Sequence, residues 1–165
     1  MAEENKEQAK QAPTEEQAKT QFLSLLEAIR MTAKDLHYCA SNTTFYGVHL
    51  MADNITGEIA EYEDKIKEVC FLGNEWQVPT SFIINAGSLA LMLQKVSEMA
   101  CLTKLHELIT LAIYTIEDLK RFNLLAGEHS LLDSISEDML KKRGFIWRTI
   151  SIDEIKEESE PENGD

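Results

Sequence analysis

Hydrophobic side chains recur at three- and four-residue intervals along most of this chain. This is the spacing of one face of an α-helix, and it differs from the strict alternation of a half-buried β-strand. The first such stretch runs from about Glu16 to Ser41. Its apolar positions are Phe22, Leu26, Ile29, Ala33, Leu36 and Ala40. The pattern predicts a long amphipathic helix whose apolar face enters the core.

Three further stretches have the same helical spacing. A glycine follows two of them, and glycine is common just after the end of a helix. The predicted ranges are about 45–72, closed by Gly73; about 89 or 102 to 125, ending at Gly127; and about 130–150. Between the second and third helices, Pro79 followed by Thr80 and Ser81 predicts the start of a short connecting helix.

Together these elements favour one all-α fold. The sequence contains no alternating strand pattern of useful length and no internal repeat. Four helices with one long crossover between the second and the third are typical of a ferritin-like four-helix bundle. We expect the bundle to occupy residues 16–150, between a disordered acidic N-terminal tail at 1–15 and an acidic C-terminal tail at 151–165.

The composition agrees with a single globular domain. Of 165 residues, 44% are hydrophobic and 27% are charged, which is enough to bury a core without covalent cross-links. No apolar run reaches the roughly 18 to 20 residues that a membrane span needs. The polar, acidic N-terminus is unlike a signal peptide. Cys39, Cys70 and Cys101 form no C-x-x-C pair, so we expect reduced core thiols in a cytoplasmic protein.

The charge of the chain bears on its partners. The formal net charge is −13, and both ends are acidic: the first twenty residues carry five Glu against three Lys, and residues 153–165 carry seven acids and one Lys. Nucleic-acid binding draws most of its affinity from Lys and Arg that neutralise phosphates. We therefore expect no direct DNA binding, and no association with a membrane.

Histidine and carboxylate residues gather on the second predicted helix and just before it. His37 and His49 are followed by Asp53, and the same helix carries Asp64 and Glu68. With His49 set to zero and about 100° per residue, the three acids fall at about 40°, 60° and 100°, so these four side chains share one stripe. Imidazole with carboxylate is a ligand set that suits iron. A solvated charged face with incidental histidines is the alternative explanation.

A single chain cannot bring both ends of this stripe to one metal ion. At about 1.5 Å of rise per residue, the His49/Asp53 pair lies roughly 16 to 22 Å from the Asp64/Glu68 pair. However, the outer two of these four residues, His49 and Glu68, have their midpoint in the sequence at 58.5. The inner two, Asp53 and Asp64, have the same midpoint. Two antiparallel copies of the helix, related by a two-fold axis at that midpoint, would set the histidine end of one chain against the carboxylate end of the other.

The residues around the midpoint suit such a contact. Gly57 and Ala60, on either side of Glu58, are small enough for two helices to approach closely. A two-fold contact uses the same surface of both subunits, so two equivalent sites per dimer would follow. The sequence therefore predicts a metal site shared across an isologous dimer.

The same five residues resemble a known ligand set. The run His37, His49, Asp53, Asp64 and Glu68 is similar in spacing to the ferroxidase ligands of the Dps family of mini-ferritins, the DNA-binding proteins from starved cells. The surrounding "LHY" is similar to that family's "LHW", and "YGVH" to its "F…LH". The stretch "EDKIKEVCFLG" resembles the segment that closes the family's second helix. The motif lies in residues 36–73, and helix order and length extend the likeness over about residues 20–150.

The resemblance implies a function and an assembly. It implies a dodecameric hollow shell, built from two-fold dimers, that oxidises ferrous iron with hydrogen peroxide or oxygen and stores the ferric mineral under oxidative stress. Two irons could bind at each site. His37 and His49 of one subunit would act with Asp64 and Glu68 of its two-fold mate, and Glu68 would bridge the two irons. Asp53 would bind the second iron or orient a histidine.

Further positions follow from the same resemblance. In the family, acidic residues near the start of the last helix line three-fold pores for iron entry, which makes Glu128 and Asp133 candidates. A preference for acids at a helix start explains these two residues almost as well.

The sequence also departs from the family. Tyr38 stands where the family usually has Trp, and the basic tail that many members use to hold DNA is missing. No E-x-x-H pair occurs, unlike the larger ferritins, whose di-iron site lies inside one bundle. Two alternatives to an iron-oxidising enzyme stay open: a non-catalytic shell or scaffold of the same fold, and a nucleoid-associated protein that protects DNA.

Overall fold

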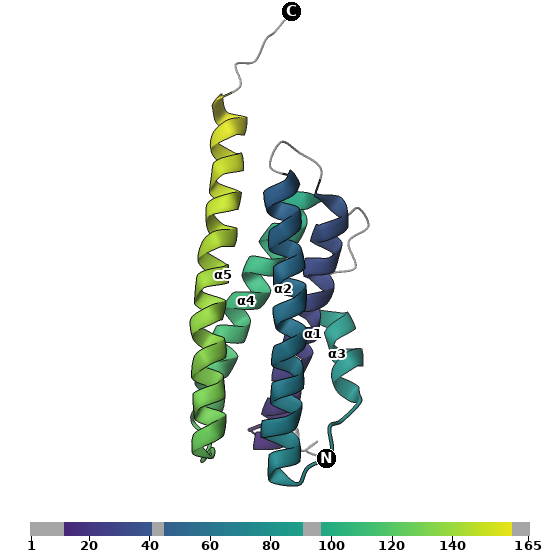
Figure 1. Cartoon of the computed structure of the whole chain (residues 1–165), viewed down its shortest axis with the longest axis vertical. Coiled ribbons are helices and arrows are strands. Elements are labelled where there is room, and N and C mark those ends of the chain that lie inside the picture. The colour runs from purple at the N-terminus through teal and green to yellow at the C-terminus, as the bar shows by residue number, and fades with distance from the viewer. Residues whose placement is uncertain (1–11, 41–44, 91–96, 160–165) are drawn as a thin grey trace, which may run out of the picture.

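The computed structural model of the chain describes residues 12–40, 45–90 and 97–159, and over these ranges its regular structure is entirely helical (Figure 1). The elements in chain order are α1 (Glu15–Cys39), α2 (Phe45–Ile66), η1 (Lys67–Phe71), η2 (Leu72–Asn74), α3 (Ser81–Leu89), α4 (Glu98–Leu119) and α5 (Ala126–Ser159). The all-α prediction is therefore confirmed.

Four long helices form a bundle. α1 packs against α2, α3 and α4, while α5 packs mainly on α4 and also touches α2. In Figure 1 the four long helices run along the same axis, with the short α3 on the flank of α1 and α5 projecting beyond the others. The short helix α3 lies in the long crossover between α2 and α4, as the sequence predicts for a ferritin-like bundle.

The predicted apolar face of the first helix lies in the core. Five of its six positions have no solvent exposure, and the sixth, Ala40, is 5% exposed. The five are Phe22, Leu26, Ile29, Ala33 and Leu36. The N-terminus of α1 is closed by a capping box, in which the hydroxyl of Thr14 accepts from the backbone N–H of Gln17 and the Gln17 side chain accepts from the backbone N–H of Thr14.

Two helix ends differ from the prediction. Gly127 does not terminate the third long helix: α4 ends at Leu119, and Gly127 lies in the first turn of α5. The carboxylate of Glu128 accepts from the backbone N–H of Leu125 at 2.8 Å, and this side-chain cap starts α5 there. At its other end α5 continues to Ser159, into the segment predicted as the acidic C-terminal tail.

The end of the second helix also differs. Regular α-helix stops at Ile66, a π-helical turn follows at Lys67–Phe71, and a 3₁₀ turn follows at Leu72–Asn74. Glu75, not Gly73, takes the left-handed conformation that ends the helical run, with φ of 60°. Gly73 was the predicted stop, and the wider π turn moves the true end past it.

A buried ion pair ties the first helix to the last one. Nζ of Lys19 lies 2.6 Å from Oε1 of Glu128, and each side chain is 2% exposed. Although burial opposes the charge on Lys19, hydrogen bonds to Glu128 and Glu15 raise its pKa. Removing one member of such a pair leaves an unpaired buried charge, which costs about 3 to 5 kcal/mol. The pair therefore helps to fix α5 against α1.

Helix α4 has the composition of a core helix. Among the described helices it alone is long and apolar enough, by length and composition, to cross a membrane. Most of its apolar residues lie in the interior of this bundle, with Leu102, Leu105 and Ile109 fully buried. Burial between neighbouring helices accounts for that composition.

Two carboxyl groups meet where α1 packs on α2. Glu27 and Glu63 are both buried, and the side chains of Arg30 and Lys67 lie beside them. Burial and the neighbouring Glu27 carboxylate raise the pKa of Glu63 to about 7. Burial opposes ionisation of Glu27 too, but hydrogen bonds from Arg30 and Glu63 lower its pKa. The two carboxyl groups can therefore lie together because Glu63 keeps its proton up to about pH 7 and because the ionised Glu27 pairs with Arg30.

This cluster predicts how stability depends on pH. A Glu63 carboxyl titrates near its ordinary pKa of 4.5 in the unfolded chain and at about 7 in the folded one, so the stability it contributes is complete in acid and is lost as the pH rises through 7. Glu63→Gln keeps a neutral donor beside Glu27. We expect the variant to match the wild type at pH 5 and to be more stable at pH 8, by roughly 3 kcal/mol at most.

Urea unfolding at fixed protein concentration between pH 5 and pH 8 measures this difference. Glu61→Gln is the matched control, because Glu61 lies on the same helix but is exposed. An equal effect of both substitutions at every pH would contradict the assignment to Glu63.

Candidate metal centre

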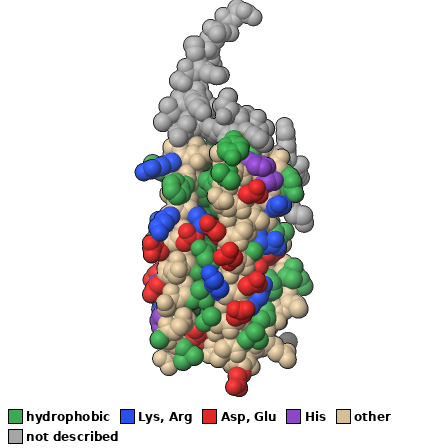
Figure 2. Space-filling model, in the orientation of Figure 1, with side chains coloured by type: hydrophobic (Ala, Val, Ile, Leu, Met, Phe, Trp, Pro, Cys, Tyr) green, Lys and Arg blue, Asp and Glu red, His purple; other side chains and the backbone are tan. Residues whose placement is uncertain are grey.

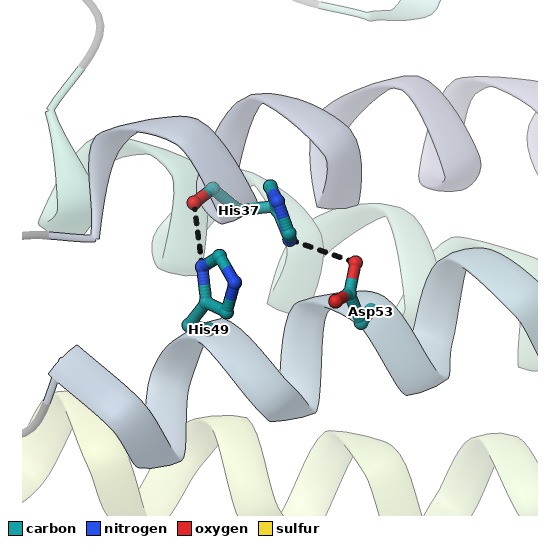
Figure 3. Close-up of side chains that lie close together, drawn as sticks. All are labelled: His37, His49 and Asp53. Carbon is teal, nitrogen blue, oxygen red and sulfur yellow. Dashed lines mark hydrogen bonds and ion pairs between the residues drawn. The ribbon is translucent and has the colours of Figure 1, made fainter.

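Three predicted ligands come from two consecutive helices. His37 lies in the last turn of α1, and His49 and Asp53 lie one turn apart near the start of α2. Figure 3 shows the three side chains in the space between these two helices. Because the two helices run antiparallel with a short connection, the end of the first faces the start of the second.

The ligand atoms of these three residues converge. One such atom from each residue lies within 4.8 Å of the other two. Nδ1 of His37 is 2.7 Å from Oδ1 of Asp53, and the imidazole rings of His37 and His49 have centroids 3.8 Å apart. Among the described residues, this is the group of His, Cys, Asp and Glu side chains with the geometry to hold a metal ion.

A backbone contact fixes the orientation of His49. Its Nδ1 donates to the carbonyl oxygen of His37 at 3.1 Å, as the dashed line in Figure 3 shows. A carbonyl can only accept, so the proton of neutral His49 is on Nδ1 and the lone pair is on Nε2. This tautomer is the one that can bind a metal through Nε2, and such contacts commonly orient metal-binding histidines.

His37 carries a further mark of a ligand. Its Nδ1 is buried and has no partner in hydrogen-bond geometry, although the Asp53 carboxylate lies close to it. A cation bound by both this nitrogen and the carboxylate would satisfy the two groups together. The donor set of two imidazoles and one carboxylate therefore fits a divalent metal ion such as iron.

The three-ligand group opens to solvent on one side. The His37 side chain is 16% exposed, whereas that of Asp53 is 46% exposed. In Figure 2 histidine side chains appear at the upper end of the face, beside an acidic side chain. Three protein ligands leave coordination positions unfilled, so the group can accept further ligands from outside the chain.

Asp64 and Glu68 lie apart from this group. Both are exposed, and Asp64 has Nζ of Lys67 at 3.6 Å as a partner. Glu68 is part of the π-helical turn, so the uniform 100° step that placed it on the stripe does not hold at its position. Within one chain, the structure does not bring these carboxylates to the histidines, as their separation along the helix requires.

The two candidate pore residues differ in their surroundings. Glu128 is buried, and its carboxylate accepts from Nζ of Lys19, the side-chain amide of Asn74 and the backbone N–H of Leu125. Leu125 directly precedes α5, and these contacts give Glu128 a structural role inside the chain. Asp133 is exposed on α5 and pairs with Nζ of Lys120 at 2.7 Å, and this hydrogen bond lowers the pKa of Asp133. Asp133 has the solvent access that a pore residue needs.

Sequence reasoning did not identify the carbonyl of His37 as part of the site. Every residue type has a backbone carbonyl, so the sequence does not show which carbonyl takes part in a site. This contact is seen only once the two facing helices are in place. Tyr38, the departure from the family pattern, packs its ring edge-on against His37 with centroids 5.0 Å apart and is otherwise exposed.

Two solved structures from one bacterium share this fold. A point mutant of Mycobacterium smegmatis Dps1 aligns with a TM-score of 0.65 at 19% sequence identity, over 82% of this chain and 94% of that chain. A C-terminal deletion mutant of M. smegmatis Dps aligns with a TM-score of 0.62 at 22% identity, over 81% and 94% of the two chains. No protein-family model and no curated protein matches the sequence. The likeness therefore concerns the fold: this chain has the ferritin-like four-helix bundle of these Dps structures.

Proposed function

We propose that this protein is a cytoplasmic mini-ferritin that oxidises ferrous iron, stores the ferric product and thereby removes both ferrous iron and hydrogen peroxide. The convergence of His37, His49 and Asp53 at the open edge of the bundle carries this proposal. The fold shared with Dps structures supports it.

The rest of the coordination sphere would come from a second copy of the chain. Asp53 faces solvent, and so do Asp64 and Glu68 further along the same helix. The shared midpoint of the ligand pairs lies beside Gly57, which is exposed and has open space around its α-carbon. Two α2 helices that cross there would place Asp64 and Glu68 of each chain at the His37/His49 end of the other.

The proposed reaction uses iron as substrate. Two ferrous ions supply the two electrons that reduce one hydrogen peroxide, with two protons, to two waters. His37 and His49 would bind one iron through neutral imidazole, the partner subunit's Glu68 would bridge two irons, and Asp53 would bind the second iron or orient a histidine. Because both electrons come from metal ions in one site, no hydroxyl radical is released.

Assembly into a shell of twelve subunits completes the proposal. The shell would enclose the mineral, and acidic residues such as Asp133 would line its entry pores. The charge of −13 per chain opposes the nucleoid-associated alternative, because DNA binding needs cationic groups that the acidic ends lack. A non-catalytic shell is the second alternative, and the first measurement below separates it from the enzyme.

The shared site predicts rescue between two inactive variants. His37→Ala with His49→Ala should abolish rapid oxidation of ferrous iron by peroxide, and so should Asp64→Ala with Glu68→Ala, because each pair removes two of the five proposed ligands. If the unfolded chains are mixed in equal amounts and refolded, about half of the dimers pair one of each under random association. Each mixed dimer has one complete site and one site that lacks all four substituted ligands, so about a quarter of all sites should recover.

Ferric absorbance after addition of ferrous iron and peroxide measures this recovery, with iron-to-peroxide stoichiometry as a second readout. Variants that are folded separately and then mixed are the control, since each subunit has already paired with a copy of the same variant. Zero recovery after co-refolding, with an active wild type, would exclude a shared site. A wild type that does not oxidise iron at all would favour the non-catalytic shell.

Gly57→Leu tests the position of the dyad. A Cβ atom added at Gly57 meets nothing within 4 Å in the single chain, and Leu favours helix over Gly by about 1 kcal/mol. We therefore expect the folded subunit to be undamaged. A close helix crossing at this point would be blocked, so dimer formation and iron oxidation should both fall at least tenfold.

Gly144→Leu is the matched control, because Gly144 is also exposed, helical and surrounded by open space, but lies on α5. Size-exclusion chromatography with light scattering reports the assembly state of both variants. Full assembly and full activity in Gly57→Leu would place the two-fold contact elsewhere.

A further inference from the structure

Two of the three cysteines face each other across the bundle. Cys39 is the last residue of α1, and Cys101 lies in the first turns of α4. Their Sγ atoms are 3.6 Å apart, although the residues are 62 positions apart in sequence. Two sulfurs at this distance are in van der Waals contact, and a disulfide bond would bring them to about 2 Å.

We infer that Cys39 and Cys101 form a redox-active pair that closes to an intramolecular disulfide when the protein is exposed to hydrogen peroxide. In the first step, peroxide oxidises the Cys39 thiol to a sulfenic acid and releases one water. In the second step, the Cys101 sulfur attacks the Cys39 sulfur, the S–O bond breaks and a second water leaves. The two thiols lose two electrons and two protons in total, and one peroxide becomes two waters.

The surroundings of the pair set the order of the steps. Cys39 is partly exposed, whereas Cys101 has no exposure, so peroxide reaches Cys39 first. Burial raises the pKa of the Cys101 thiol to about 12. Protonated thiols react slowly with peroxide. The pair therefore stays reduced under ordinary conditions and closes over minutes to hours of sustained exposure.

The third cysteine has no such partner. Cys70 is buried at the other end of α2, in the π-helical turn, and the groups around it are those of the Lys19–Glu128 ion pair. Burial raises its pKa to about 12 as well. It is therefore an internal reference: a buried thiol of the same protein that peroxide should leave reduced.

A disulfide here would join two helices that meet beside the metal-binding group. The bond would hold the end of α1, which carries His37 two residues earlier, to the start of α4. Closing a loop of 62 residues removes much of the freedom of the unfolded chain, so the oxidised protein should unfold roughly 5 to 15 °C higher than the reduced one. The inference does not depend on the proposed iron chemistry.

The test uses the full wild-type chain without iron. The protein is treated with millimolar hydrogen peroxide in the presence of a metal chelator, and free thiols are then blocked with N-ethylmaleimide in denaturant before trypsin digestion. The sequence places Cys39, Cys70 and Cys101 in three different tryptic peptides, 35–65, 68–95 and 96–104. Mass spectrometry should find peptides 35–65 and 96–104 linked with loss of two hydrogen atoms, and peptide 68–95 labelled at its thiol.

Variants and reduction separate the possible results. Cys39→Ala and Cys101→Ala should each abolish the link, Cys70→Ala should retain it, and dithiothreitol should restore labelling of all three wild-type thiols. The wild-type peptide map stands even if a variant folds poorly. Sulfinic or sulfonic acid at Cys39 with Cys101 still labelled, a link between Cys39 residues of two chains, or full labelling of all thiols after hours would each overturn the inference.

Discussion

The hydrogen bond from His49 to the carbonyl oxygen of His37 is the contact on which the candidate site depends. It joins the end of α1 to the start of α2 and selects the imidazole tautomer that can bind a metal. It also sets the register of the two helices at this end, so that Asp53, one turn along α2, reaches the His37 ring. One contact between a side chain and the backbone thus has both a structural and a chemical consequence.

The sequence predicts the fold well because the period of the apolar residues reports which face is buried. The first helix shows this: every apolar position of its stripe lies in the core. Helix ends are predicted less well, because they depend on tertiary contacts. Gly127 has the appearance of a helix stop. However, the buried Glu128 caps the start of the next helix at Leu125, so that Gly127 lies inside that helix. At the end of α2, the chain inserts a π-helical turn, and no residue type marks such a turn in advance.

The part of the candidate site that lies within one chain could be predicted from the sequence, for a geometric reason. His49 and Asp53 are one turn apart on one helix, and His37 lies just before the connection, so local geometry brings the three together. Asp64 and Glu68 are too far along the helix to join them, and the proposed second half depends on another copy of the chain. The predicted angle of Glu68 also assumed a regular helix, whereas the residue lies in the π turn.

The charged residues of the chain divide by burial into two groups with different consequences. Lys19, Glu63 and Glu128 are buried and engaged with other helices, so their substitution changes stability. Asp64 and Glu68 are exposed, and the fold gains little from them because exposed ion pairs are worth less than about 1 kcal/mol. Carboxylates that the fold does not need can be replaced without unfolding the subunit. Loss of function at these positions, in a chain that still folds, would therefore report on metal binding directly.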